Sequence, residues 1–262
     1  MTDLARTGKV GFLIGHHDEY DRMVDILARL SRPNILLVGD PGAGKETLVN
    51  HLAFKISKDE VPPELFDKRL VMLQIGSLVS GAEMAELQKR INSIVEEIIQ
   101  AGNIILYIPE VHNLVKTSAR AGLNAADILL PAISSSAFSV IGATNPQEYK
   151  RSLEPQVDFV KSFETINVEE ISAEDATKLL VYDAIILERQ YRIKITFGAV
   201  KQSVMLASKY FRDKLLPTSA EDLLKEALSD AKGKGDKILS ADDIIDIAQR
   251  RVNIPLRQAK DE

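Results

Sequence analysis

A glycine-rich loop separates an apolar run from a helix-forming run near the start of this chain, and few folds accommodate that arrangement. The apolar run, Ile35–Val38, predicts a buried strand, and the residues from Glu46 to about Ser57 predict a helix. The loop reads Gly-Asp-Pro-Gly-Ala-Gly-Lys, which is the spacing G-x-x-x-x-G-K. Its glycines let backbone N–H groups turn toward phosphate oxygens, and the N-terminus of the following helix adds a positive dipole end. The alternative interpretation is a glycine-rich turn that binds nothing.

We expect this loop to bind the phosphates of ATP or ADP, with the Lys45 ammonium reaching the β- and γ-phosphates. The candidate nucleotide-binding residues of the loop are Gly39, Asp40, Pro41, Gly42, Ala43, Gly44, Lys45, Glu46 and Thr47.

One position departs from the phosphate-loop pattern. The residue after the lysine is usually Ser or Thr, whose hydroxyl binds Mg²⁺, but here it is Glu46, and Thr47 comes one residue late. We expect Mg²⁺ to arrive only with the nucleotide, with Glu46 as its possible protein ligand, because carboxylate oxygen suits this ion. Two alternatives remain. The negative charge of Glu46 stabilises the N-terminus of its helix through the helix dipole, or its carboxylate competes with phosphate and weakens nucleotide binding.

Composition excludes several classes of protein. The 262 residues are 45% hydrophobic and 27% charged, which is typical of soluble globular chains rather than disordered, collagenous or membrane proteins. Without cysteine there is no disulfide framework, thiolate zinc site or cysteine nucleophile. The net charge of −5 and the lack of a basic block argue against nucleic-acid binding. No apolar run approaches a membrane span, and we expect a cytoplasmic protein without membrane contact.

The order of apolar runs predicts an α/β fold over residues 1–168. Short β-branched runs alternate with helical patterns, which is typical of a parallel sheet covered by helices on both faces. The expected strands are Ile35–Val38, Val71–Ile75, Ile104–Ile108, Ser139–Ala143 and Thr165–Val168.

Residues 169–255 predict a small helical domain, and residues 256–262 a polar tail or linker. Three segments place a serine before acidic residues, at Ser172, Ser219 and Ser240, which is typical of helix N-caps. A further helix is expected over Ala199–Phe211, and Lys232–Lys237 predicts a flexible turn.

The order of these motifs resembles the first AAA+ module of the Clp-type protein unfoldases and disaggregases. The resemblance implies a phosphate-loop α/β domain with a five-stranded parallel sheet and a helical lid. It also implies other AAA+ modules or subunits as partners in a hexameric ring, and polypeptides as possible substrates. The segments that carry it are Leu4–Glu19, Ile35–Thr47, Gly76–Ala82, Ala101–His112, Asn124–Ala132, Ile141–Tyr149, Leu216–Leu224 and Asp242–Leu256.

The resemblance also implies roles for individual residues. The opening segment, with Leu13, Ile14 and Gly15, corresponds to the part of the family that packs on adenine. Glu110 corresponds to the base that activates water, or is a plain exposed carboxylate. Asn145, with Thr144 as a second candidate, corresponds to the polar residue that orients the attacking water, or is a turn-forming Asn-Pro.

Other matched positions depart from the family pattern. Pro109 replaces the aspartate that supports Mg²⁺. Lys161 lies where the family supplies an arginine to the neighbouring subunit, and lysine lacks the planar fork of arginine; otherwise it is a solvated charge. Met84 lies in the substrate-gripping loop, where the family has an aromatic residue, and is a weak contact or an ordinary apolar residue.

These departures predict a degenerate module that binds ATP or ADP, hydrolyses ATP weakly or not at all, and supports ring assembly and protein unfolding. The alternatives are an active ATP-hydrolysing unfoldase motor and a nucleotide-free scaffold or interaction domain.

Overall fold

The computed structural model describes residues 2–4, 13–29, 31, 33–79, 84–116 and 124–252. Two compact units make up the chain: residues 1–40 with 44–169 form an α/β unit, and residues 170–262, with which the short segment 41–43 is grouped, form a helical unit. Among the described helices, none combines the length and apolar character needed to cross a membrane.

The α/β unit is built on one sheet with the strand order β1-β3-β4-β5-β2-β6. Five strands are parallel, and only the two-residue edge strand β1 is antiparallel to its neighbour. The predicted α/β class with five parallel strands is therefore confirmed, and the sequence pattern missed only the short edge strand. The strands are β1 Thr2–Asp3, β2 Ile35–Val38, β3 Arg69–Met72, β4 Ile104–Ile108, β5 Ser139–Thr144 and β6 Glu164–Asn167.

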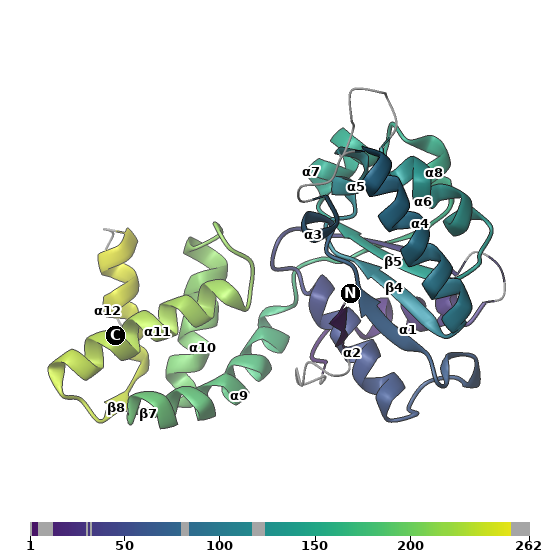
Figure 1. The fold of residues 1–262 in the computed structure, drawn as a ribbon. Coiled ribbons are helices and arrows are strands. Elements are labelled where there is room, and N and C mark those ends of the chain that lie inside the picture. The colour runs from purple at the N-terminus through teal and green to yellow at the C-terminus, as the bar shows by residue number, and fades with distance from the viewer. Residues whose placement is uncertain are drawn as a thin grey trace. The chain divides into compact units, whose positions relative to one another are not determined.

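Helices cover both faces of this sheet (Figure 1). On one face lie α1 His17–Leu27 and α2 Lys45–Ser57. On the other lie α3 Ile75–Val79, α4 Met84–Ala101, α5 His112–Lys116, α6 Ala125–Ser134 and α8 Val157–Lys161. Short turns complete the unit, namely the 3-10 turn Pro63–Leu65, α7 Pro146–Glu148 and the π-helical turn η3 Tyr149–Leu153.

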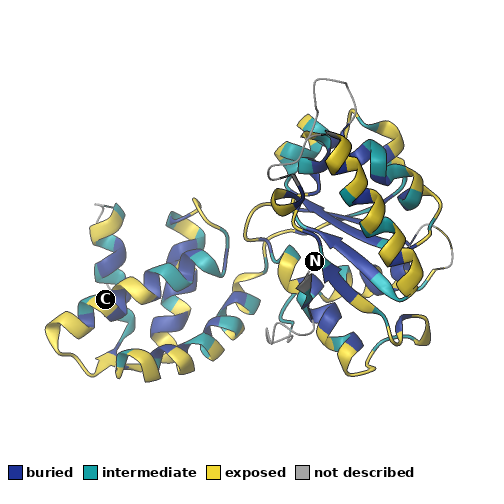
Figure 2. Ribbon diagram, in the orientation of Figure 1, coloured by how far each residue is buried: buried dark blue, intermediate teal, exposed yellow. Residues whose placement is uncertain are grey.

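Apolar strand residues form the core of the unit. All four residues of β2 are buried, as are the last four of β4. One cluster joins Leu36, Leu106 and Val140 of the sheet to Ile91 and Leu129 of the covering helices. Figure 2 shows the strands almost wholly buried and the exposed residues on the outer helix faces. This burial explains why continuous apolar runs identified the strands.

A buried polar side chain joins three parts of the sheet region. Asn34 directly precedes β2 and is 1% exposed. Its amide nitrogen donates to the carbonyls of Ile133, at 3.2 Å, and Ser162, at 3.1 Å, and its Oδ1 accepts from the backbone N–H of Val140 at 2.9 Å. Asn34 thereby satisfies backbone groups of α6, of the turn after α8, and of β5.

The helical unit packs four helices around their own apolar core. They are α9 Ala173–Tyr191, α10 Phe197–Tyr210, α11 Thr218–Lys234 and α12 Ala241–Val252, with two short parallel strands, β7 Lys194–Ile195 and β8 Ile238–Leu239. Leu180, Val204, Leu224 and Ile244 bring one buried side chain from each helix into this core.

Three local predictions were wrong in part. The run Val71–Ile75 is not one strand, because β3 ends at Met72 and α3 begins at Ile75. Ser219 is not an N-cap, because α11 already begins at Thr218. The turn predicted at Lys232–Lys237 is helical as far as Lys234, because buried Ala231 and Leu228 anchor the end of α11. By contrast, Ser172 caps α9 as predicted, accepting from the N–H of Asp175 at 3.0 Å.

Candidate functional site

The candidate site lies where β2, β4 and β5 end. β5 is paired with both β4 and β2, so the carboxyl ends of these three parallel strands share one edge of the sheet. The phosphate loop follows β2, Glu110 follows β4, and Asn145 follows β5. The backbone N–H of Gly39 donates to the Thr144 carbonyl at 3.2 Å, which joins the start of the loop to the end of β5. Ligands of open α/β sheets bind at this kind of edge.

The loop has the backbone conformation that its glycines permit. Gly42 and Gly44 have φ of 88° and 94°, a region that residues with a side chain rarely adopt, and Gly44 immediately precedes α2. The N-terminus of α2 therefore follows a tight left-handed turn. Its first-turn N–H groups and positive dipole end make an anion-binding position.

Glycine is required at position 39 because the Val168 carbonyl leaves no room for a side chain, and not because of an unusual backbone angle φ. We expect Gly39→Ala to lower the free energy of unfolding by about 2–3 kcal/mol, because its Cβ would lie 2.2 Å from the Val168 carbonyl oxygen. Gly42→Ala is the matched control: no described atom lies within 4 Å of its Cβ, so only backbone strain of about 1 kcal/mol is added. Urea unfolding measures both variants, and equal losses of stability would contradict this assignment.

The Lys45 ammonium is turned back into the loop. Its Nζ donates to the carbonyls of Gly39, at 2.6 Å, and Asp40, at 2.8 Å. Burial lowers the pKa of Lys45, and the nearby Asp40 charge partly opposes this shift. A cation held over the loop can exchange these carbonyls for phosphate oxygens without a large movement.

Glu46 and Thr47 are exposed in the first turn of α2. The charges of Glu46 and Glu110 both act on the buried Tyr107 of β4: burial is the main cause that raises the pKa of this phenol, and the two carboxylates raise it further. The negative charges of Glu46 and Glu110 thus both act on the Tyr107 phenol. Tyr107 carries no functional signal in the sequence, because a residue within a buried apolar strand indicates only packing.

These residues do not provide the usual ligands of Mg²⁺. Glu46 replaces the hydroxyl ligand and Pro109, which is half-buried after β4, carries no oxygen donor on its side chain. The described residues include no cluster of three or more His, Cys, Asp or Glu side chains arranged to hold a metal. The loop has groups suited to phosphates, but the described residues offer no cluster of side-chain ligands for a metal ion.

Glu110 is exposed at a strained turn. Its φ is 52°, and its Oε2 accepts a hydrogen bond from Asn113 Nδ2 at 3.3 Å. The carboxylate is therefore partly engaged by its own turn. Its predicted role as the base stays a prediction.

Asn145 has a structural role in the described conformation. Its Oδ1 accepts from the Glu148 N–H at 2.9 Å and so caps α7, which matches the turn-forming alternative. Thr144 is buried, with its Oγ1 3.0 Å from His112 Nδ1. His112 therefore joins the segment after β4 to the end of β5. Burial, followed by the charge of Lys116, lowers the pKa of His112, which favours the neutral imidazole.

The opening segment meets the phosphate loop through His16. Leu13, Ile14 and Gly15 are half-buried just before it. A Cβ built on Gly44 would lie 2.9 Å from His16 Nε2, so the imidazole ring sits directly against the loop. The segment expected to pack on adenine is therefore anchored beside the residues expected to bind phosphate. This contact could not be predicted from the sequence, because only the fold brings residues 16 and 44 together.

Two further candidates belong to α8 and α4, on the other face of the sheet from α2. Lys161 is the exposed last residue of α8. Met84 is the first residue of α4, and its side chain and the preceding residues 80–83 lie outside the described part of the structure. Their predicted roles stay predictions.

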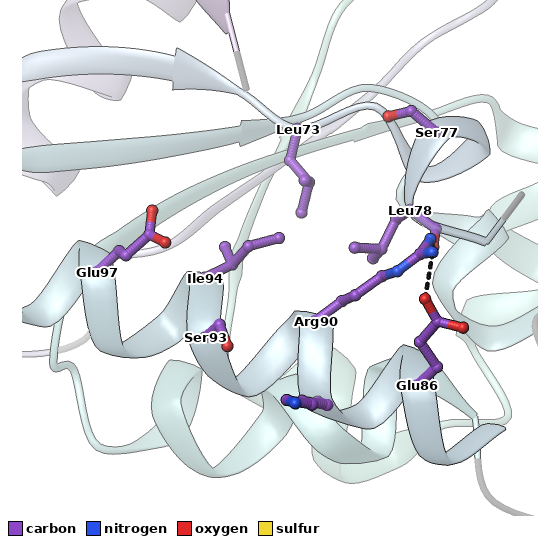
Figure 3. Close-up of a pocket in the computed structure, with 9 residues that line it drawn as sticks. Leu73, Ser77, Leu78, Glu86, Arg90, Ser93, Ile94 and Glu97 are labelled. Atoms are coloured by element: carbon purple, nitrogen blue, oxygen red, sulfur yellow. Dashed lines mark hydrogen bonds and ion pairs between the residues drawn. The ribbon is translucent and has the colours of Figure 1, made fainter. Parts of the chain in front are cut away.

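A hollow lies between α3 and α4, with a volume of about 770 Å³ (Figure 3). Arg90 reaches across it, donating to the Leu78 carbonyl at 3.1 Å and to Glu86 Oε1 at 2.6 Å. Its lining residues are Leu73, Ser77, Leu78, Glu86, Lys89, Arg90, Ser93, Ile94 and Glu97. None of them belongs to the phosphate loop.

Comparisons with known proteins agree with this geometry. Residues 35–167 match the ATPase family associated with various cellular activities (AAA), and residues 172–262 match the AAA lid domain. The ATP-binding subunit ClpC of the ATP-dependent Clp protease is 35% identical over 236 residues in both Staphylococcus epidermidis and Staphylococcus aureus. These matches cover 89% of this chain but only 29% of ClpC.

Solved structures of Hsp104 have the same fold as this chain. A closed-state complex of Hsp104 with ATPγS and casein has a TM-score of 0.86 at 29% identity, covering 99% of this chain and 46% of that one. The ADP complex of Saccharomyces cerevisiae Hsp104 gives the same values. This chain thus spans less than half the length of each of these relatives.

Proposed function

Because the chain belongs to the AAA ATPase family and is a Clp-type AAA+ module, we propose that it binds ATP or ADP at its phosphate loop and hydrolyses ATP weakly or not at all. The conformation of the phosphate loop is the main support for this proposal. It holds the Lys45 ammonium on the Gly39 and Asp40 carbonyls at the start of α2, next to a glutamate where the metal-binding hydroxyl belongs. The cation supports binding, and the glutamate argues against efficient turnover.

Each part of the site would then have its own role. Backbone N–H groups at the start of α2 and the Lys45 ammonium bind the phosphates. The opening segment, with Leu13, Ile14 and Gly15, packs on the base. Mg²⁺, when it arrives with the nucleotide, neutralises phosphate charge. Glu110 remains as a candidate base, but Pro109 and Lys161 replace two groups on which the family's hydrolysis depends.

The proposed biological setting follows from the relatives. ClpC is named as the ATP-binding subunit of a protease, and Hsp104 was solved with casein. We propose that this module, with a large domain over residues 1–168, a lid over 169–255 and a tail over 256–262, joins other AAA+ modules or subunits in a cytoplasmic ring. In that ring its nucleotide would support assembly and the unfolding of polypeptides.

Calorimetric titration of ATP and ADP, with and without Mg²⁺, tests the proposal when phosphate release is assayed on the same sample. We expect micromolar binding and phosphate release slower than about 1 s⁻¹, the low end of ordinary enzyme turnover. Turnover at or above that rate would contradict the weak hydrolysis and support the active motor, which the retained Glu110 favours. No binding at millimolar nucleotide would leave a nucleotide-free scaffold.

Glu46→Thr is expected to tighten ATP binding about three- to tenfold when Mg²⁺ is present, because it removes a negative charge beside the phosphates and restores a hydroxyl ligand. The same titration measures the dissociation constant. Glu64→Thr is the control, since Glu64 is an exposed carboxylate in the short turn before β3. Unchanged affinity in Glu46→Thr would show that the carboxylate does not compete with phosphate.

A further inference from the structure

The His16 side chain places a buried ring nitrogen, Nε2, against the phosphate loop. The side chain is only 6% exposed, and this nitrogen has no hydrogen-bond partner among the described residues. This nitrogen faces Gly44, because a Cβ placed there would lie 2.9 Å from Nε2 and 3.2 Å from Cδ2. A buried polar atom without a partner is rare and costs free energy, so it needs an explanation.

The other ring nitrogen has a charged neighbour. His16 Nδ1 lies 3.7 Å from Glu19 Oε1, one turn along α1. A proton on Nδ1 is favoured by this carboxylate, which leaves Nε2 as the nitrogen with a lone pair toward the loop. Protonation of Nε2 would therefore create a full positive charge on the ring, against the start of α2.

The charges around the ring decide when that second proton is stable. On α1, Asp18 and Glu19 favour a positive ring, and His17 is a second titratable neighbour. Among the charged residues of the loop and of the first turn of α2, Lys45 and the positive helix end would oppose a positive ring, whereas Asp40 and Glu46 would favour it. Bound phosphates would place several negative charges at that helix end and so reverse its effect on the ring.

We propose that His16 is a proton-linked binding residue of the nucleotide site, whose Nε2 takes up a proton when a nucleoside di- or triphosphate binds. This inference rests on the proposed function, because it requires nucleotide in the phosphate loop. The positive ring then stabilises the bound phosphates through the Gly44 segment. By reciprocity, a lower pH strengthens nucleotide binding over the range in which the imidazole titrates, about pH 5 to 8.

The test is calorimetric titration of ADP into the 262-residue chain at pH 7, in buffers of equal pH and different ionisation enthalpy. The dependence of the heat on the buffer gives the number of protons taken up. We expect the wild type to take up about 0.3–0.8 proton more than His16→Gln, which retains a polar nitrogen but cannot titrate. Subtracting the variant removes the contribution of the ADP phosphate itself. The wild type should also bind about three- to tenfold more tightly at pH 6 than at pH 8, beyond any change in the variant.

His17→Gln is the matched control, because His17 is the exposed neighbour in the sequence. It should leave proton uptake unchanged. Imidazole NMR resonances of His16 in the wild type, followed over pH with and without ADP, give the same answer should His16→Gln fail to fold. We expect ADP to move the titration midpoint of His16 to higher pH.

The outcomes separate the two proposals. Binding of ADP with equal proton uptake in the wild type and in His16→Gln, or an unmoved His16 midpoint, would overturn the role of His16 and leave nucleotide binding intact. Loss of uptake in His17→Gln alone would also overturn it. No binding heat from the wild type at millimolar ADP would overturn the proposed function and this inference together.

Discussion

Lys45→Ala is expected to weaken the binding of ADP or ATP by about 100-fold or more. The Lys45 ammonium is already over the loop, where it donates to two backbone carbonyls and faces no competing carboxylate ion pair among the described contacts. Hydrogen bonds from a cation to phosphate contribute about 1.5–3 kcal/mol each, and a loss of roughly 3 kcal/mol corresponds to about 100-fold. Calorimetric titration of the variant measures this loss directly.

Lys55→Ala is the control for Lys45→Ala. Lys55 lies in the last turn of the same helix, α2, where its ammonium pairs with Glu60 at 2.5 Å. Its removal changes the net charge by the same amount without touching the loop, so nucleotide affinity should change less than about twofold. Equal losses in the two variants would show that Lys45 acts only through net charge and that the phosphates do not bind in this loop.

Asn34→Ala is expected to lower the free energy of unfolding of the α/β unit by about 4 kcal/mol. The change removes three hydrogen bonds and leaves the carbonyls of Ile133 and Ser162 and the N–H of Val140 without their partner in a buried place. Each unsatisfied buried group costs about 1–3 kcal/mol. Urea unfolding followed by circular dichroism measures the loss, and amide hydrogen exchange of residues 139–167 assigns it to this unit.

Asn103→Ala provides the comparison for Asn34. Its Nδ2 makes one hydrogen bond, to the Asp67 carbonyl at 2.9 Å, in a half-buried position near the start of β4. We expect a loss of about 1 kcal/mol or less there. A loss for Asn34→Ala no larger than for Asn103→Ala would mean that water or a local shift replaces the bonds of Asn34.

Strand positions were predictable wherever burial came from a continuous apolar run. Ile35–Val38 and Ile104–Ile108 match β2 and β4 residue for residue, because both lie in the middle of a sheet covered on both faces. The end of the strand predicted at Val71–Ile75 was not predictable. β3 pairs with β4 from Arg69 to Met72, and the chain then leaves the sheet and enters α3. Leu73 and Ile75 are nevertheless as apolar as the residues of the buried strands.

Helix ends in the second unit show the same limit. Serine followed by acidic residues marked the true start of α9 at Ser172, but not that of α11, which begins one residue before Ser219. Glycine and lysine at the end of α11 favour a turn, yet the buried side chains of Leu228 and Ala231 keep the helix intact to Lys234. Tertiary packing overrides these weak local preferences.

The phosphate loop, its placement between a strand and a helix, and the order of α/β and helical segments were predictable from the residues alone, since these features depend on neighbouring residues and on periodicity. By contrast, it is the folded arrangement of strands and helices that makes Asn34 bond to residues about 100 positions away and that places His16 against Gly44. Strand register and helix packing bring residues that are far apart in the sequence into contact. Those positions carry no local pattern that a sequence can display.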